Sequence, residues 1–146
     1  MPQTALKVMF VAGFGPIVRD PAASRALYRD TLGLPLEAMP NDETYLHAEG
    51  IDGVRHFALW PLAQAAQSCF GSPQWPASVP EPRSWLEFDV EDVGTASAEL
   101  QRRGYQLLVN NRKEPWGQTV TRLLSPEGIL IGITFTPWLR GQAAGS

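Results

Sequence analysis

The stretch that decides the fold reads VRDPAASRALYRDTLGL and spans residues 18–34. Asp20 followed by Pro21 predicts a helix start, because an aspartate side chain caps free backbone N–H groups and proline suits the first helical position. Apolar residues recur at helical spacing after this cap until Gly33 ends the helix. The apolar run Val8 to Val18 precedes the cap and predicts a strand. The chain therefore opens with a strand followed by a helix.

A second copy of this pattern reads VEDVGTASAELQRRGY at residues 90–105. Asp92 is the expected cap, 72 positions after Asp20, and Gly104 is the expected helix end. Strand-like segments flank the two helices: Tyr45–His47, Val54–Trp60, Trp85–Val90, Tyr105–Val109, Thr119–Leu124 and Ile129–Thr136. Two copies of a strand, a helix and three strands describe the chain most economically.

The 146 residues suffice for one domain, which we place at residues 1–146. A proline-rich stretch at about residues 61–82 separates a first module, about 6–60, from a second, about 83–138. Proline removes a backbone donor and disfavours helix in the preceding residue, so this stretch is expected to be a linker. It has room for at most a short helix over Leu62 to Ser68.

Composition excludes several classes of protein. With 44% hydrophobic and 18% charged residues the chain is typical of ordered globular proteins. A net charge of -3 argues against a nucleic-acid partner, and the single Cys69 excludes an internal disulfide. No apolar stretch is long enough for a membrane span and the first residues lack a signal-peptide pattern. We expect a cytoplasmic protein.

Side chains alternate between the two faces of a strand, so each predicted strand gives two sets of residues. One face is mainly apolar and should cover the helices: Phe57, Leu59, Leu86, Phe88, Val90, Ile129, Ile131, Ile133 and Phe135. The opposite faces are mixed and suit a concave, partly hydrated pocket: His56, Ala58, Trp60, Trp85, Glu87, Asp89, Gly132, Thr134 and Thr136.

Trp60 and Trp85 are the best candidates to line that pocket, because two large rings on one face can hold a planar or cationic ligand. Glu87 and Asp89 on the same face favour a cation, and His56, a possible general base, and Glu87 are weak candidates for a catalytic role. Further candidate ligand contacts are His56, Thr134 and the loop residue Trp116. Packing in the core, or a solvated strand face, is the alternative reading of each of these residues.

The quoted segments, together with SPEGILIGITF at residues 125–135, resemble the vicinal oxygen chelate superfamily. Glyoxalase I, extradiol dioxygenases, fosfomycin-resistance transferases and bleomycin-resistance proteins belong to it. The resemblance implies an α+β fold with two tandem βαβββ modules. Their curved mixed sheets surround a cavity, with the helices on the outer face. It also implies a homodimer.

The resemblance further implies where a metal would bind. Metal-dependent members carry a ligand on the first and the last strand of each module, and these positions fall at Gly13, Ala58, Trp85 and Gly132. None of the four can bind a metal, so we expect no metal and no cofactor. The alternative is one divalent metal ion at a displaced site, with His56 and Glu87 joined by a further ligand such as His47 or Asp89.

We therefore expect a metal-independent small-molecule binding protein that sequesters a planar or cationic compound, as bleomycin-resistance proteins do, and thereby gives antibiotic resistance. In this interpretation the protein performs no bond chemistry. The alternative is a glyoxalase- or dioxygenase-type metalloenzyme, catalysing a lyase, isomerase or ring-cleavage reaction with the displaced ligands. A third possibility is a degenerate module that acts in protein–protein contact.

Overall fold

The computed structural model describes residues 6–140. These residues form two compact units, which we call the first unit (residues 13–85) and the second unit (residues 6–12 together with 86–140). The predicted domain of residues 1–146 extends at both ends beyond the described residues, and its boundaries and the module limits remain predictions.

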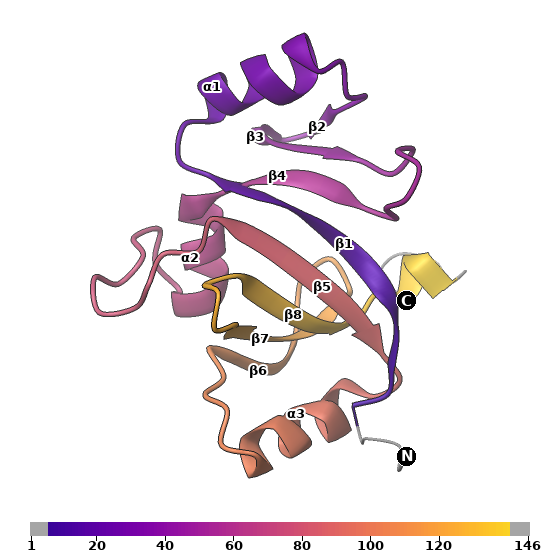
Figure 1. Ribbon diagram of the computed structural model, residues 1–146, viewed down its shortest axis with the longest axis vertical. Coiled ribbons are helices and arrows are strands. Elements are labelled where there is room, and N and C mark those ends of the chain that lie inside the picture. Colours follow the sequence, from indigo (N-terminus) through magenta and orange to yellow (C-terminus); the bar gives the residue numbers. More distant parts are fainter. Residues whose placement is uncertain (1–5, 141–146) are drawn as a thin grey trace. The chain divides into compact units, whose positions relative to one another are not determined.

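The first unit contains four strands and two helical segments (Figure 1). Its elements are β1 (Val8–Val18, which begins in the second unit), α1 (Pro21–Arg25) with the π-helix η1 (Ala26–Thr31), β2 (Glu37–Met39), β3 (Asp42–Ala48), β4 (Phe57–Pro61) and α2 (Leu62–Phe70). The strand order is β2-β3-β4-β1. β1 is parallel to β4, whereas β2–β3 and β3–β4 are antiparallel.

The first helix begins as expected and then changes character. The side chain of Asp20 accepts a hydrogen bond from the Ala23 amide at 3.1 Å, and Pro21 occupies the first helical position. The single helix predicted from the sequence is wrong in its second half, which is a π-helix. The Leu32 amide there bonds to the Leu27 carbonyl, five residues back. Short π segments are rare and widen a helix locally.

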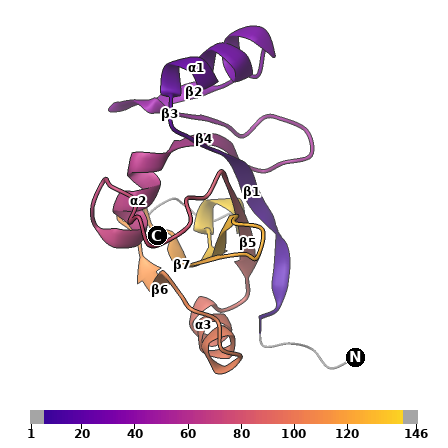
Figure 2. The same ribbon diagram turned by 60° about the vertical axis from the view of Figure 1, so that its left-hand side comes forward.

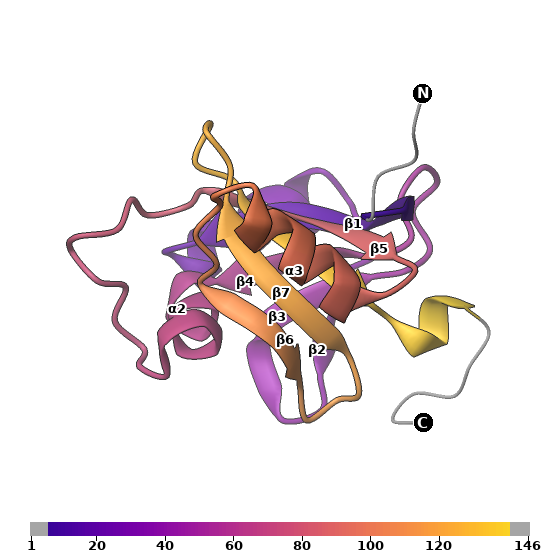
Figure 3. The ribbon, with the colours of Figure 1, turned by 90° about the horizontal axis from the view of Figure 1, so that it is seen from below.

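The second unit repeats the plan (Figure 3). Its elements are β5 (Ser84–Val90, which begins in the first unit), α3 (Val93–Arg102), β6 (Val109–Lys113), β7 (Thr119–Leu124), β8 (Leu130–Phe135) and the 3₁₀ helix η2 (Pro137–Arg140). The order is β5-β8-β7-β6, with β6–β7 and β7–β8 antiparallel. Asp92 caps α3 through the Thr95 amide, and Gly104 follows the helix with a positive φ of 92°.

In each unit a helix covers one face of the strands. α1 lies alongside β2 and β3 in two views (Figure 1, Figure 2), and α3 crosses β6 and β7 (Figure 3). Phe57 and Leu59 of β4 pack with Tyr28 in the core beside α1. The corresponding core beside α3 contains Phe88, Val90, Ile131, Ile133 and Phe135. The predicted apolar faces are confirmed at these positions, and the α+β fold with outer helices is confirmed with them.

One further prediction concerns the region between β4 and β5. The short helix allowed over Leu62 to Ser68 is present as α2, two residues longer, and it buries Cys69. The glycine that follows, Gly71, takes the left-handed conformation that commonly ends helices.

Within residues 6–140, no helix combines the length and the apolar character needed to cross a membrane.

Candidate functional site

The face of the first unit opposite α1 carries rings from three strands. His47 of β3 lies directly across from Ala58 of β4, and Ala58 alternates with the core residues Phe57 and Leu59. Side chains at alternate positions share a face. We call the set on this side the aromatic face: Tyr45, His47, His56, Trp60 and Trp85.

The rings of the aromatic face form a connected series. His56 lies at its centre, with ring centroids 5.9 Å from His47, 6.3 Å from Tyr45 and 6.0 Å from Trp85. Trp60 meets Trp85 edge to face at 6.4 Å. Edge-to-face and offset rings at such distances attract one another through their quadrupoles. The two tryptophans predicted to share a ligand therefore do contact each other.

Trp85 is fixed in this series by two glycines of β1. Its indole N–H donates to the Ala58 carbonyl at 3.1 Å. A Cβ atom at Gly15 would lie 3.0 Å from the indole nitrogen and 2.0 Å from that same carbonyl oxygen. A Cβ at Gly13 would lie 3.0 Å from the ring and 2.4 Å from the His56 carbonyl oxygen. The close approach of β1, β4 and the ring thus requires glycine at both positions.

Three polar side chains converge at one edge of the aromatic face. A carboxylate oxygen of Glu49 lies 2.9 Å from Nδ1 of His47 and 2.6 Å from Nδ1 of His56. On the far side of the His56 ring, Nε2 lies 2.8 Å from the Tyr45 hydroxyl. The imidazoles are partly exposed, at 19% and 24% of their side chains, and Glu49 is 47% exposed. These groups are within reach of solvent and of a ligand.

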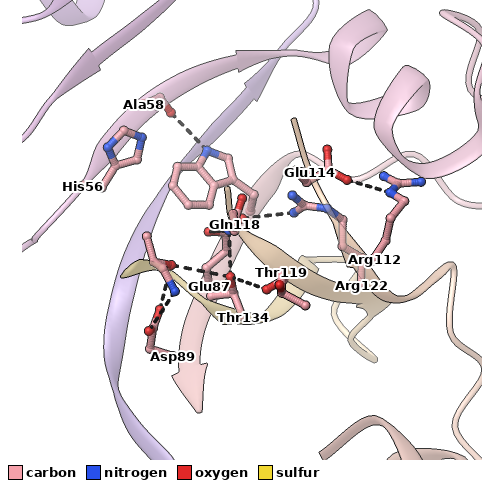
Figure 4. Close-up of polar contacts among 12 residues, drawn as sticks. His56, Ala58, Glu87, Asp89, Arg112, Glu114, Gln118, Thr119, Arg122 and Thr134 are labelled. Atoms are coloured by element: carbon pink, nitrogen blue, oxygen red, sulfur yellow. Dashed lines mark hydrogen bonds and ion pairs between the residues drawn. The ribbon is translucent and has the colours of Figure 1, made fainter. Parts of the chain in front are cut away.

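The corresponding face of the second unit is filled by hydrogen-bonded polar side chains (Figure 4). Glu87 pairs with Arg122 at 3.0 Å and accepts a hydrogen bond from the Gln118 side-chain amide, also at 3.0 Å. That amide also donates to the hydroxyl of Thr134, which itself donates to the Thr119 carbonyl. Arg122 is only 1% exposed. The carboxylate of Glu87 is thus already neutralised by a buried guanidinium.

Asp89 is likewise committed within the second unit. Its carboxylate accepts hydrogen bonds from the amide and hydroxyl of Thr136 and from the guanidinium of Arg140, the last at 2.8 Å. The side chain is 0% exposed. Burial raises the pKa of Asp89, although these hydrogen bonds and the charge of Arg140 oppose the rise.

The structure places the sequence candidates in two separate groups. Trp60, Trp85 and His56 lie together in the first unit, whereas Glu87, Asp89 and Thr134 belong to closed networks of the second unit. Trp116, also in the second unit, is 48% exposed, and its indole N–H donates to the side chain of Gln118 at 2.8 Å.

Sequence reasoning gave no role to Tyr45 or Glu49 and named His47 only as an auxiliary ligand. The spacing Tyr45, His47, Glu49 holds the missed signal, because residues two apart point to the same side of a strand.

The four positions that the family resemblance assigns to metal ligands do not fit a metal. The indole N–H of Trp85 is a donor already bound to Ala58, and alanine has no ligand atom. Gly132 lies under the side chain of Glu87, where a Cβ would come 2.7 Å from its Cγ. A divalent ion needs several nitrogen, oxygen or sulfur donors. No metal can be held by these four residues.

Comparison with known proteins identifies the fold and the family. The Glyoxalase/Bleomycin resistance protein/Dioxygenase superfamily matches the chain over residues 14–133. No curated protein matches the chain.

Among solved structures, methylmalonyl-CoA epimerase from Mycobacterium tuberculosis is similar with a TM-score of 0.59 and 18% identity, covering 97% of each chain. A superfamily member from Vibrio splendidus 12B01 has a TM-score of 0.56 and 16% identity, covering 86% of this chain and 97% of that one. A methylmalonyl-CoA epimerase variant from Streptomyces coelicolor, in complex with 2-nitronate-propionyl-CoA, has a TM-score of 0.55 and 20% identity, covering 88% and 97%. At such identities the likeness concerns the fold.

Proposed function

The chain belongs to the Glyoxalase/Bleomycin resistance protein/Dioxygenase superfamily, and from this premise we propose that it binds a small planar organic molecule on the aromatic face of its first unit. The fold itself does not select among the activities of the superfamily, so the function must be argued from the site. The proposal needs no metal at the superfamily's usual positions.

One observation carries the proposal: partly exposed rings gather on one sheet face. His47, His56 and Trp60 are each partly exposed, while Trp85 behind them is 4% exposed and held by its indole hydrogen bond. A flat ligand that stacks on such rings gains about 0.5 to 1.5 kcal/mol per ring pair beyond the burial of its area. Because these rings are already packed together, little side-chain freedom is lost on binding.

A positively charged ligand is favoured by Glu49. Its exposed carboxylate lies between two imidazoles, whereas Glu87 and Asp89 are paired with Arg122 and Arg140. The predicted preference for a cation therefore rests on Glu49 and on the tryptophan faces, which attract cations.

The proposal extends to the biological role. Stoichiometric binding of a toxic planar compound in the cytoplasm would give antibiotic resistance without bond chemistry. We also propose a homodimer, in keeping with large apolar side chains of β1 left exposed in the single chain: Val8 (54%), Met9 (54%) and Val11 (45%). Light scattering of the purified protein measures this directly, and a monomeric mass at all concentrations would contradict the dimer.

Tryptophan fluorescence is the test of binding. We would titrate the protein with proflavine, a planar cation, with fluorescein, a planar anion, and with bleomycin. We expect quenching that saturates with proflavine at a lower concentration than with fluorescein. Trp60→Ala should weaken proflavine binding about tenfold, which corresponds to the loss of about 1.4 kcal/mol of stacking.

Trp75→Phe is the matched control, because Trp75 donates to the Val79 and Pro80 carbonyls and is not one of the rings of the aromatic face. Trp85→Ala is less informative, since it empties a buried site and should destabilise the fold by about 3–5 kcal/mol. Equal proflavine affinity in Trp60→Ala and Trp75→Phe would overturn the assignment of the aromatic face.

The rival function is a glyoxalase- or dioxygenase-type metalloenzyme that uses His56 and Glu87 as displaced ligands. Its weakness is Glu87, which would have to leave Arg122 and Gln118. Abandoning a buried partner costs several kcal/mol. Purified protein that loses a bound ion in both Glu87→Gln and His56→Ala would favour this rival.

A further inference from the structure

We propose that His47, Glu49 and His56 form a binding site for one first-row divalent transition-metal ion. The site is distinct from the four positions that the superfamily uses for its metal, and it lies wholly within the first unit. It goes beyond the proposed binding of a planar molecule: the ion would be held by residues on and beside the aromatic face, and its binding does not require the planar molecule.

The geometry of the three side chains carries the proposal. One potential ligand atom from each residue lies within 4.8 Å of the other two. Oxygens of Glu49 are 2.9 and 3.1 Å from Nδ1 of His47, and one is 2.6 Å from Nδ1 of His56. Metal–ligand bonds of about 2.0–2.2 Å place neighbouring donors about 3 Å apart. An ion can therefore enter when the donors move to this spacing, which for Glu49 and His56 means moving apart.

The donor set selects a class of metal. Two imidazoles and one carboxylate suit Zn²⁺, Ni²⁺ or Fe²⁺, whereas Ca²⁺ and Mg²⁺ prefer sites made of oxygen ligands. Three protein donors leave at least one coordination position for water or for an oxygen atom of a ligand. Such an open site differs from a closed structural site, in which the protein supplies every ligand.

Tyr45 supplies the outer contact that metal-bound histidines commonly have. Its hydroxyl lies 2.8 Å from Nε2 of His56, on the opposite side of the ring from Glu49. When the phenol oxygen accepts the Nε2–H, the lone pair of His56 is placed on Nδ1, facing the ion. Such partners fix the ring orientation and its tautomer. Tyr45 is therefore a positioning residue of this site.

The strands hold the ligands in place. His47 lies within β3 and is paired with Ala58 of β4, while Glu49 and His56 lie immediately beyond the ends of these two strands. Ligands on paired strands, or directly next to their ends, need little reordering to bind an ion. The 47% exposure of Glu49 gives the ion a path of entry.

Zinc binding by the 146-residue chain tests the proposal. We would purify the protein without a tag or chelator, strip it with a chelator, dialyse it, and titrate Zn²⁺ by calorimetry. One ion per chain is expected. Glu49→Gln and His47→Gln should each weaken binding more than about a hundredfold, and Tyr45→Phe about ten- to a hundredfold, the usual range for outer contacts.

Asp30→Asn is the matched control, because it replaces a carboxylate by the same amide on η1, where Asp30 pairs with the neighbouring Arg29. Its zinc affinity should equal that of the unchanged protein. Circular dichroism and thermal unfolding show whether each variant is folded. Imidazole nitrogen NMR on the unsubstituted protein adds a readout without mutation, because zinc should shift the Nδ1 signals of both histidines.

Two results would overturn the proposal. One is folded protein that takes up no zinc and shows unchanged imidazole signals. The other is zinc affinity in Glu49→Gln equal to that of Asp30→Asn. If either occurs while proflavine still quenches the tryptophans, only the metal site fails. Loss of proflavine binding with zinc uptake intact would instead remove the proposed function alone.

Discussion

The sheet face opposite the helix, which we call the inner face, carries different kinds of side chain in the two units, although both units share one plan. Each unit begins with a strand and a helix capped by an aspartate, Asp20 or Asp92. In the second unit the inner face is closed by buried ion pairs of Glu87 and Asp89. In the first unit it consists of rings, with imidazole and carboxylate atoms still partly exposed.

The same fold can therefore use its charged residues in two ways. Charges that pair with each other across buried strands are costly to separate and leave nothing for a ligand. Charges at the solvent edge contribute little to stability and remain available for binding. In this repeated fold the first unit therefore carries the candidate binding face, and the charges on the inner face of the second unit pair with each other.

The largest loss of stability is expected when the buried ion pair on the inner face of the second unit is broken. Arg122→Met removes the partner of Glu87; the side chains of Glu87 and Arg122 are 14% and 2% exposed. Loss of one partner of a buried pair costs about 3–5 kcal/mol. Urea unfolding measures it. The exposed pair Arg19–Glu81 of the first unit provides the control, since Arg19→Met should cost less than about 1 kcal/mol. Equal losses would contradict the comparison.

A substitution that crowds the inner face of the first unit should reduce the stability somewhat less. Gly15→Ala places a Cβ 2.0 Å from the Ala58 carbonyl oxygen, and this backbone atom cannot move without disturbing the pairing of β1 with β4. We expect a loss of about 3 kcal/mol, at the upper end for overpacking. Gly50→Ala is the control, because a Cβ there has no neighbour within 4 Å. A Gly15→Ala protein as stable as Gly50→Ala would show that β1 is free to shift.

A glycine on the inner face of the second unit, Gly132, should tolerate substitution by alanine better than Gly15 does. Gly132→Ala places a Cβ 2.7 Å from Cγ of Glu87, which is a side-chain atom and can move aside. The movement strains the contacts with Arg122 and Gln118, so we expect a loss of about 1–2 kcal/mol. The same unfolding experiment compares both substitutions. A larger loss for Gly132→Ala than for Gly15→Ala would reverse this ranking.

The pKa values of two aspartates should be shifted in opposite directions, and their effect on stability should be the smallest. Burial raises the pKa of Asp89 above 3.8. Burial also acts to raise the pKa of Asp42, but hydrogen bonds from Thr44 and Gln64 outweigh it and lower the pKa below 3.8. Carbon NMR of the two carboxyl groups measures both values directly. The reverse order of titration would show that Arg140 outweighs burial at Asp89.

The sign of the effect on stability follows from these shifts. Asp42 contributes stability above its unfolded pKa, and this is lost as the pH falls through the lower folded value. The contribution of Asp89 is fully present below its unfolded pKa and is lost as the pH rises through the higher folded value. Asp42→Asn should therefore reduce the loss of stability in acid, as measured by thermal unfolding between about pH 2 and pH 5.

Much of the fold could be predicted because its signals are local. The strands Val8–Val18 and Thr119–Leu124 have the predicted bounds, and both aspartate caps are present. The predictions failed where chain direction depends on turns. Residues 54–56 precede β4 instead of belonging to it, and β6 begins at Val109, where its predicted strand ends. Apolar character alone cannot distinguish such flanking segments from strands.

The candidate site was predictable only in part, for the same reason. Alternation along a strand placed Trp60, Trp85 and His56 on inner faces, because side-chain direction has a period of two residues. It could not show that Glu87 meets Arg122, 35 residues away, since that contact depends on the pairing of distant strands.

By itself, the sequence determined the caps, the repeated strand–helix plan and the apolar faces, because each depends on residues close together in the chain. Tertiary structure alone decided which charges are neutralised and which remain accessible. It brought Arg140 to Asp89 and left Glu49 between His47 and His56 at a solvent-exposed edge. Electrostatic energy depends on distance and burial in space, which the sequence pattern does not contain.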